Sequence, residues 1–234
     1  MKRNASSRAA LLTAAAFCAT AAASGAMAQD SGRYGFVYGG AVLNSDLNTS
    51  GIIGGNPQTV DTDYDDGFQF GLGVGLRLPQ WSTDNVGVRV ELDLSYSDTD
   101  ADEIRFSGNG PNPEVNVSGG LQSTTLFANI LADFDTGSAV TPFVGAGLGV
   151  GRFSQDLVYG PGVQVNESDT AFGAQLIAGV AWQVSDRVTL TADTRYRRFF
   201  DVESNRFAPS GASTGVVSGD VSAVSLNLGA RIAF

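Results

Sequence analysis

The 234-residue chain has no histidine, one lysine and one cysteine. Without histidine, the chain cannot be a hydrolase that moves a proton at neutral pH with an imidazole. The single lysine, Lys2, and the single cysteine, Cys18, both lie in the first residues. Phe17 is too bulky to precede the cysteine of a lipoprotein signal, so lipidation is not expected. Beyond these first residues, no apolar run is long enough for a membrane-spanning helix.

The first 28 residues have the pattern of a secretory signal. Lys2, Arg3 and Arg8 form a positive start, and an alanine-rich apolar stretch follows over residues 9–23. Ala26-Met27-Ala28 then gives the small residues of a cleavage site. An uncleaved anchor is the alternative, but the apolar stretch is short and broken by polar residues. We therefore predict a signal peptide over residues 1–28 and a mature domain over residues 29–234.

The mature part is strongly acidic and rich in glycine. Its cations are eleven arginines, and they stand against all 24 acidic residues of the chain. Such a surface repels nucleic acid, so a nucleic-acid partner is excluded. The 30 glycines suit many strands and tight turns better than helices.

Apolar and polar residues alternate along the whole mature chain, which predicts β-strands. In 86–96, valines, leucines and a tyrosine occupy every second position, and Gly87, Arg89, Glu91, Asp93 and Ser95 lie between them. The same alternation predicts eight strands, at Arg33–Val42, Phe68–Leu78, Val86–Tyr96, Thr124–Phe134, Val140–Phe153, Phe172–Val184, Val188–Phe199 and Val221–Phe234.

The connections between these strands alternate in length. The short ones are predicted at residues 79–85, 135–139 and 185–187. The long ones are predicted at 43–66, 98–119, 154–169 and about 200–220. An even number of antiparallel strands with short turns at one end and long loops at the other is typical of an outer-membrane barrel. The sequence therefore predicts an all-β fold, an eight-stranded antiparallel up-and-down transmembrane β-barrel, with both termini at the periplasmic end.

Alternation alone does not say which face looks outward, since a soluble barrel would hide the apolar face. The placement of aromatic residues favours a membrane. One group falls near the short-turn end and another near the long-loop end, as expected for girdles at two bilayer interfaces. The first group is Tyr34, Trp81, Phe134, Trp182 and Phe234, and the second is Phe68, Tyr96, Phe172 and Tyr196.

The chain ends on an alternating strand with phenylalanine as the last residue. Its apolar positions are Leu226, Leu228, Ala230, Ile232 and Phe234. This ending resembles the C-terminal signature of bacterial outer-membrane proteins, and the whole mature chain resembles the small outer-membrane β-barrel proteins, a group that includes the opacity proteins and the OmpA transmembrane domain. The resemblance implies that the outer-membrane barrel-assembly machinery reads these five residues. Nothing follows Phe234, so the peptidoglycan-binding domain of OmpA-like proteins is not expected.

Charged residues on the face opposite the apolar one are the main candidate site. An eight-stranded barrel is filled by side chains, and unpaired charges inside it are strongly disfavoured. We therefore predict a lumen network of ion pairs made of Arg77, Arg89, Glu91, Asp93, Asp133, Asp193, Arg195, Arg197 and Arg231. A plugged lumen of this kind is favoured over an ion-conducting gate.

Glycines recur every second residue at 71–75 and 145–151, without the spacing of a phosphate-binding loop. We interpret them as inward positions where space is short. The acidic stretch 61–67 lacks the glycine and glutamate of an EF-hand. A weak divalent-cation site at Asp61, Asp63, Asp65 and Asp66 is the alternative to a solvated acidic loop.

The four predicted long loops hold 16 acidic residues against Arg105 and Arg206. Any exposed ligand is therefore expected to be basic or bridged by a metal. We predict a non-enzymatic protein of a Gram-negative outer membrane, without a cofactor, that contacts membrane lipid and lipopolysaccharide and serves envelope integrity, surface interaction and adhesion. The alternative function is a narrow porin-like channel or a transporter of small solutes or small apolar molecules.

Overall fold

The computed structural model describes residues 32–53, 56–107, 117–159, 163–207 and 213–234. The predicted signal peptide lies outside these residues. The chain separates into two units, and residues 32–233 form the unit that contains the strands. Among the described residues, no helix has the length and apolar character needed to cross a membrane.

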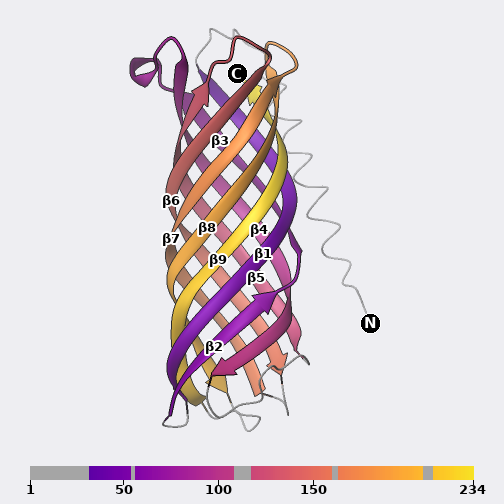
Figure 1. The fold of residues 1–234 in the computed structure, drawn as a ribbon, viewed down its shortest axis with the longest axis vertical. Helices are drawn as coiled ribbons and strands as arrows, with labels where there is room; N and C mark the ends of the chain where they lie inside the picture. The colour runs from indigo at the N-terminus through magenta and orange to yellow at the C-terminus, as the bar shows by residue number, and fades with distance from the viewer. Residues whose placement is uncertain (1–31, 54–55, 108–116, 160–162, 208–212) are drawn as a thin grey trace. The chain divides into compact units, whose positions relative to one another are not determined.

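Nine strands and one short 3-10 helix, η1, make up the described unit, and Figure 1 shows the strands as long, tilted ribbons. Their bounds are β1 Arg33–Ile53, β2 Asn56–Tyr64, β3 Gly67–Arg77, η1 Pro79–Trp81, β4 Val86–Ser107, β5 Ser118–Phe134, β6 Val140–Tyr159, β7 Val163–Gln183, β8 Val188–Phe207 and β9 Ser213–Ala233. Every pairing between neighbours is antiparallel.

The nine strands fill eight positions in a closed ring. β2 and β3 both pair with β1 on one side and β4 on the other, so they share one position, interrupted at Asp65 and Asp66. From β3 the order runs through β4 to β9, and β9 pairs with β1. In the turn-proximal half, every described strand is paired on both sides, which a membrane requires because hydrocarbon offers no hydrogen-bond partner. The predicted eight-stranded antiparallel fold is confirmed.

The orientation of the two faces is that of a membrane barrel over the turn-proximal half of the strands. Leucines and valines of the alternating stretches point outward, with Leu148 60% and Leu228 72% exposed. Arginines and acids of the same strands point inward, and Arg89 and Asp93 are each 1% exposed. This arrangement answers the question that alternation alone leaves open.

The strands are much longer than predicted. β4 has 22 residues and β6 has 20, whereas about 9–11 tilted residues cross the hydrocarbon. The four segments predicted as long loops are therefore wrong in their bounds, since most of their described residues continue the strands. We call the part of the barrel beyond the aromatic residues Phe68, Tyr96, Phe172 and Tyr196 the extension.

The extension has an apolar interior, which the sequence analysis did not foresee. One cluster of buried residues fills it: Leu47, Val60, Tyr64, Ile104, Leu121, Phe127, Phe153, Leu157, Ala171, Phe199, Val202 and Val221. The pairing is irregular between Val42 and Asn44 of β1 and between Phe199 and Val202 of β8. At these points the inward-facing positions change from even to odd residue numbers on β1 and from odd to even on β8. On β8 the shift brings Val202 inward after Phe199, whereas β6 buries Phe153 and Leu157 in the extension without any shift.

Candidate functional site

A network of charged and polar side chains, which we call the polar plug, occupies the interior of the turn-proximal half beside a small cluster of buried apolar residues, Leu131, Phe143, Ile177 and Ala181. The lowest layer of the polar plug centres on Arg89 of β4. The Arg89 guanidinium contacts Glu91 of the same strand and donates from Nε to Asp133 of β5 at 2.9 Å. The Tyr34 hydroxyl of β1 donates to Glu91 at 2.8 Å. Three strands are thus tied together around one buried cation.

The middle layer centres on Arg195 of β8. Its Nη1 lies 2.5 Å from an oxygen of Asp93, and its Nε lies 2.8 Å from Asp193. The guanidinium carbon lies 3.7 Å from the centre of the Tyr38 ring. The Tyr38 hydroxyl donates to Asp93 at 3.0 Å. Both carboxylates therefore face the same cation, which offsets the cost of burying them.

Arg197 forms the top of the polar plug without touching a carboxylate among the described residues. It donates to the amide oxygens of Gln175 at 3.1 Å and Gln69 at 3.0 Å, and to the Tyr38 hydroxyl at 3.1 Å. Neutral oxygens thus replace the ion pair that the sequence analysis expects for this residue.

The remaining two predicted arginines differ from the rest. Arg231 of β9 lies 4.8 Å from the centre of the Phe143 ring, and within the described residues it forms no ion pair. Arg77 lies at the exposed end of β3 and forms no ion pair with any described residue. The structure thus brings eight of the nine predicted residues into the interior and leaves Arg77 at its mouth.

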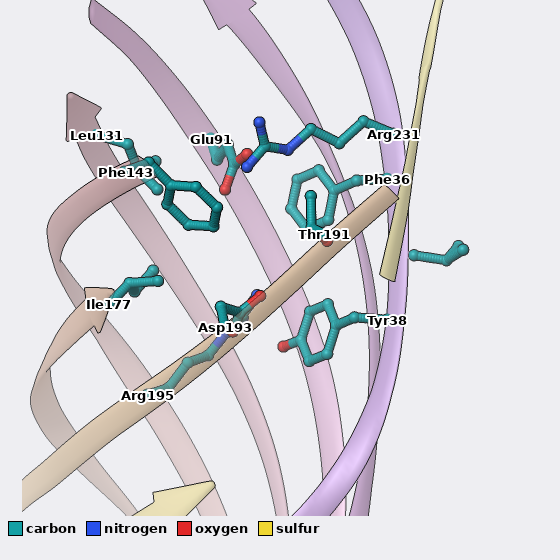
Figure 2. Close-up of a pocket in the computed structure, with 11 residues that line it drawn as sticks. Phe36, Tyr38, Glu91, Leu131, Phe143, Ile177, Thr191, Asp193, Arg195 and Arg231 are labelled. Atoms are coloured by element: carbon teal, nitrogen blue, oxygen red, sulfur yellow. The ribbon is translucent and has the colours of Figure 1, made fainter. Parts of the chain in front are cut away.

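The interior leaves little free space. Figure 2 shows side chains from several strands converging on one cavity, among them Glu91, Phe143, Arg195 and Arg231. This cavity has a volume of about 10 Å³, and a second one, where the polar plug meets the apolar cluster, has a volume of about 30 Å³. The first volume holds about one water molecule. The side chains around the first cavity are therefore held by paired charges and hydrogen bonds among the described residues.

Glycines make the room for the aromatic side chains of β1. Gly71, Gly73 and Gly75 of β3 pair with Tyr38, Phe36 and Tyr34, and a Cβ on any of the three would collide with the opposing ring. The rings therefore point inward, and Tyr34 is 5% exposed. The prediction that Tyr34 belongs to an outer girdle is wrong, because the glycines opposite give its ring space inside.

The outer face of the extension is polar and acidic. Asp61 and Asp63 lie on β2, and Asp65 and Asp66 are exposed at the break between β2 and β3. Asp63 contacts Arg105 at 3.1 Å. Within the described ranges, no group of three acidic, histidine or cysteine side chains is placed to hold a metal. The four aspartates are therefore spread along the wall rather than gathered at one point.

Arg105 and Tyr64 of the extension both have raised pKa values. The hydrogen bond and charge of Glu103, together with Asp63, raise the pKa of the exposed Arg105. Burial raises the pKa of the Tyr64 hydroxyl well above its ordinary value, and this hydroxyl has no hydrogen-bond partner among the described residues. Both shifts keep the ordinary protonation state at neutral pH, so neither group serves as an acid or base there.

The predicted assembly residues lie on β9 or directly after it. Leu226, Leu228 and Phe234 are exposed, and Ala230 and Ile232 are half-buried. Over Tyr34–Val42 and Val188–Thr194, β9 pairs with both β1 and β8. The strand that carries this pattern is therefore the one that closes the ring.

Several members of the polar plug were not predicted from the sequence because they are neutral. Asn129 and Gln175 meet at 2.5 Å, and Asn227 donates to Asp193 at 3.0 Å. Gln69 donates to Asn227 and to Ser225. Each lies on the same alternating face as the charged residues, so its place in the alternation could have identified it from the sequence.

The comparisons with known proteins agree with this geometry. Residues 9–234 match the family described as "Outer membrane protein beta-barrel domain". A search among curated proteins gives no match.

Three solved structures share the fold. The outer membrane protein OprG from Pseudomonas aeruginosa is 14% identical with a TM-score of 0.57, covering 87% of this chain and 97% of its own. The outer membrane protease OmpT from Escherichia coli is 8% identical with a TM-score of 0.51, covering 86% and 97%. A major outer membrane protein from Thermus thermophilus is 15% identical with a TM-score of 0.50, covering 85% and 99%. At these identities, the likeness concerns the fold alone.

Proposed function

Since the chain belongs to the outer membrane protein beta-barrel family, its place is the outer membrane, and we propose that it serves there as a closed barrel for envelope integrity and surface contact. The observation that carries this proposal is the double filling of its interior. The polar plug occupies the turn-proximal half, and the apolar cluster occupies the extension. A solute would have to displace both.

The charge of the extension supports a role in surface contact. Its described outer face carries many carboxylates, among them Asp63, Asp100, Asp156 and Asp169, and few arginines. A partner that approaches this wall gains from positive charge, since complementary fields speed encounter and favour the right orientation. Lipopolysaccharide and membrane lipid contact the apolar band, and a basic extracellular ligand contacts the extension.

The orientation and biogenesis of the protein belong to the same proposal. Residues 1–28 are removed on export, and the short turns and both mature termini face the periplasm. The pairing of Tyr34 with Ala233 supports one common end for both termini. The barrel-assembly machinery reads Leu226, Leu228, Ala230, Ile232 and Phe234.

Catalysis is not part of the proposal. The inward acids Glu91, Asp93 and Asp193 all face arginine. A carboxylate held in an ion pair is a poor general base because its charge is already stabilised. The mature chain has no histidine or lysine that could act together with the exposed acids.

Transport of a small apolar molecule is the second candidate, and the apolar lining of the extension favours it. Purified protein in planar bilayers and liposomes separates the two. The closed barrel predicts no stable conductance steps and no sugar-driven liposome swelling. Persistent porin-like steps would overturn it, and faster partition of an apolar dye into protein-containing liposomes would favour transport.

A further inference from the structure

The wall of the extension is not uniformly paired. Between β7 and β8 the ladder runs from Gln183 to Phe172 and then stops, and only the pair of Gln164 with Phe207 follows. Residues 165–171 of β7 and 201–206 of β8 therefore face each other without backbone pairing. We call this stretch the seam. In the described parts of the other ladders, irregularities span no more than two residues.

Each edge of the seam is held on its other side. Residues 163–171 of β7 pair with β6, and residues 202–206 of β8 pair with β9. The seam is therefore formed by two ordered strand edges with unpaired N–H and C=O groups. Such edges are templates for another extended chain.

At the seam, aspartate carboxylates accept hydrogen bonds from backbone N–H groups that would otherwise donate to a neighbouring strand. The Glu203 N–H donates to the Asp169 carboxylate at 2.8 Å, where a backbone carbonyl would accept in a ladder. A second oxygen of Asp169 accepts from the Thr170 N–H at 2.7 Å. The Asp201 N–H donates to Asp220 at 3.3 Å, and Asp201 has a φ of 54°, which few residues other than glycine adopt.

The charge around the seam favours one kind of partner. The exposed or half-buried acids Asp156, Asp169, Asp201, Glu203 and Asp220 border it, against three nearby arginines, Arg152, Arg198 and Arg206. Arg198 is itself paired with Asp220 at 2.7 Å. An incoming strand that replaced Asp169 would leave that carboxylate free to meet a basic side chain.

We propose that the seam binds an extended basic peptide segment by strand addition. The peptide backbone pairs with the edges of β7 and β8, which separate to admit it, and its lysine or arginine side chains meet the bordering carboxylates. Backbone pairing gives affinity and alternate side chains give specificity in this mode of recognition. The inference rests on the proposed surface function and names the partner of that function.

A disulfide across the seam tests the inference. Ser168→Cys and Glu203→Cys place thiols on facing strands, and mature protein has no other cysteine because Cys18 lies in the predicted signal peptide. The probe is a synthetic peptide of alternating lysine and valine, measured by fluorescence anisotropy against protein in detergent micelles. The reduced and oxidised forms of the same variant serve as the matched pair. Closing the disulfide should weaken binding by about tenfold or more.

A second probe separates strand addition from adsorption to an acidic surface. Replacing the central valine with proline removes a backbone donor and keeps every charge, so it should also weaken binding by about tenfold. Equal binding of both peptides, or equal binding to both redox forms, would overturn the seam and leave the surface function intact. Absence of binding by any basic peptide would overturn both.

Discussion

The two halves of this barrel bury different mixtures of side chains. Charged groups dominate the turn-proximal half, beside a small apolar cluster around Phe143, and apolar groups dominate the extension. In the turn-proximal half, Arg195 and Asp93 lie inside and Leu228 lies outside. In the extension, Ile104 and Leu121 lie inside, and Asp100 and Glu203 lie outside. The difference follows from the solvent, because lipid accepts apolar surface and water accepts charge. A β-strand can serve both solvents, since its alternation fixes only that its two faces differ.

The two interiors also achieve stability differently. The polar plug depends on matched charges around Arg89 and Arg195, where arginine and carboxylates offset one another's burial cost, and on neutral oxygens around Arg197. The extension depends on apolar burial and close packing, as in a soluble protein. Substitutions that break one interior should therefore obey rules that do not apply to the other.

The largest effect is expected from Arg195→Ala. This change leaves Asp93 and Asp193 buried without their cation and should lower the free energy of unfolding by about 3–5 kcal/mol. Urea unfolding in lipid vesicles, followed by the fluorescence of Trp81 and Trp182, measures it. Adding Asp93→Asn and Asp193→Asn should recover part of the loss. A triple variant no more stable than the single one would show that charge matching is not the cause.

The extension should respond to loss of volume instead. Ile104 is 1% exposed in the apolar cluster, so Ile104→Ala should cost about 2–5 kcal/mol through lost burial and a cavity. Ile52→Ala is the control, because Ile52 is 65% exposed, and should change stability by about 0.5 kcal/mol or less. Equal effects of the two changes would contradict an apolar core in the extension.

The outer faces can be compared with one added charge. Leu228→Arg places a cation against lipid and should destabilise by about 2–4 kcal/mol. Ser218→Arg on the exposed outer face of the extension should change stability by about 0.5 kcal/mol or less. Folding yield in vesicles, read from heat-modifiable migration on a gel, gives a rapid check. A tolerated Leu228→Arg would place that residue outside the bilayer.

A smaller effect is expected where glycine faces a ring. A Cβ at Gly73 would collide with the carbonyl oxygen of Leu92 and with the ring of Phe36, so Gly73→Ala should cost about 1–3 kcal/mol. Gly87→Ala is the matched control, since its nearest neighbours, Cβ and the carbonyl oxygen of Asp133, lie 3.8 and 3.9 Å from the new Cβ. Thermal unfolding of both variants in the same detergent compares them.

The sequence predicted the ring well because period-two alternation is a local and repeated signal. Strand pairing, the short turns and the position of the terminal strand all followed from it. The length of the strands did not follow, because the lipid-facing alternation ends before the strands do. Beyond Tyr96, β4 continues with Asp98 and Asp100, which resemble loop residues until their pairing with β5 is known.

The polar plug was only partly predictable for a different reason. Charged residues on the inward face identified its members, since burial demands partners for them. Which partner each takes depends on contacts across the lumen, such as Arg195 with Asp93 on strands far apart in the sequence. The inward rings of Tyr34 and Tyr38 depend on glycines of the neighbouring strand, which alternation within one strand does not reveal.

Accessibility along the outer face of β6 tests the reversal of solvent most directly. Single cysteines at Val144, Leu148, Val150, Ser154 and Asp156 would carry a nitroxide label in vesicles. The account predicts that collisions with oxygen dominate through Val150 and that collisions with a polar nickel complex dominate from Ser154 onward. A label at Asp156 that oxygen reaches better than nickel, or one at Leu148 with the opposite preference, would contradict it.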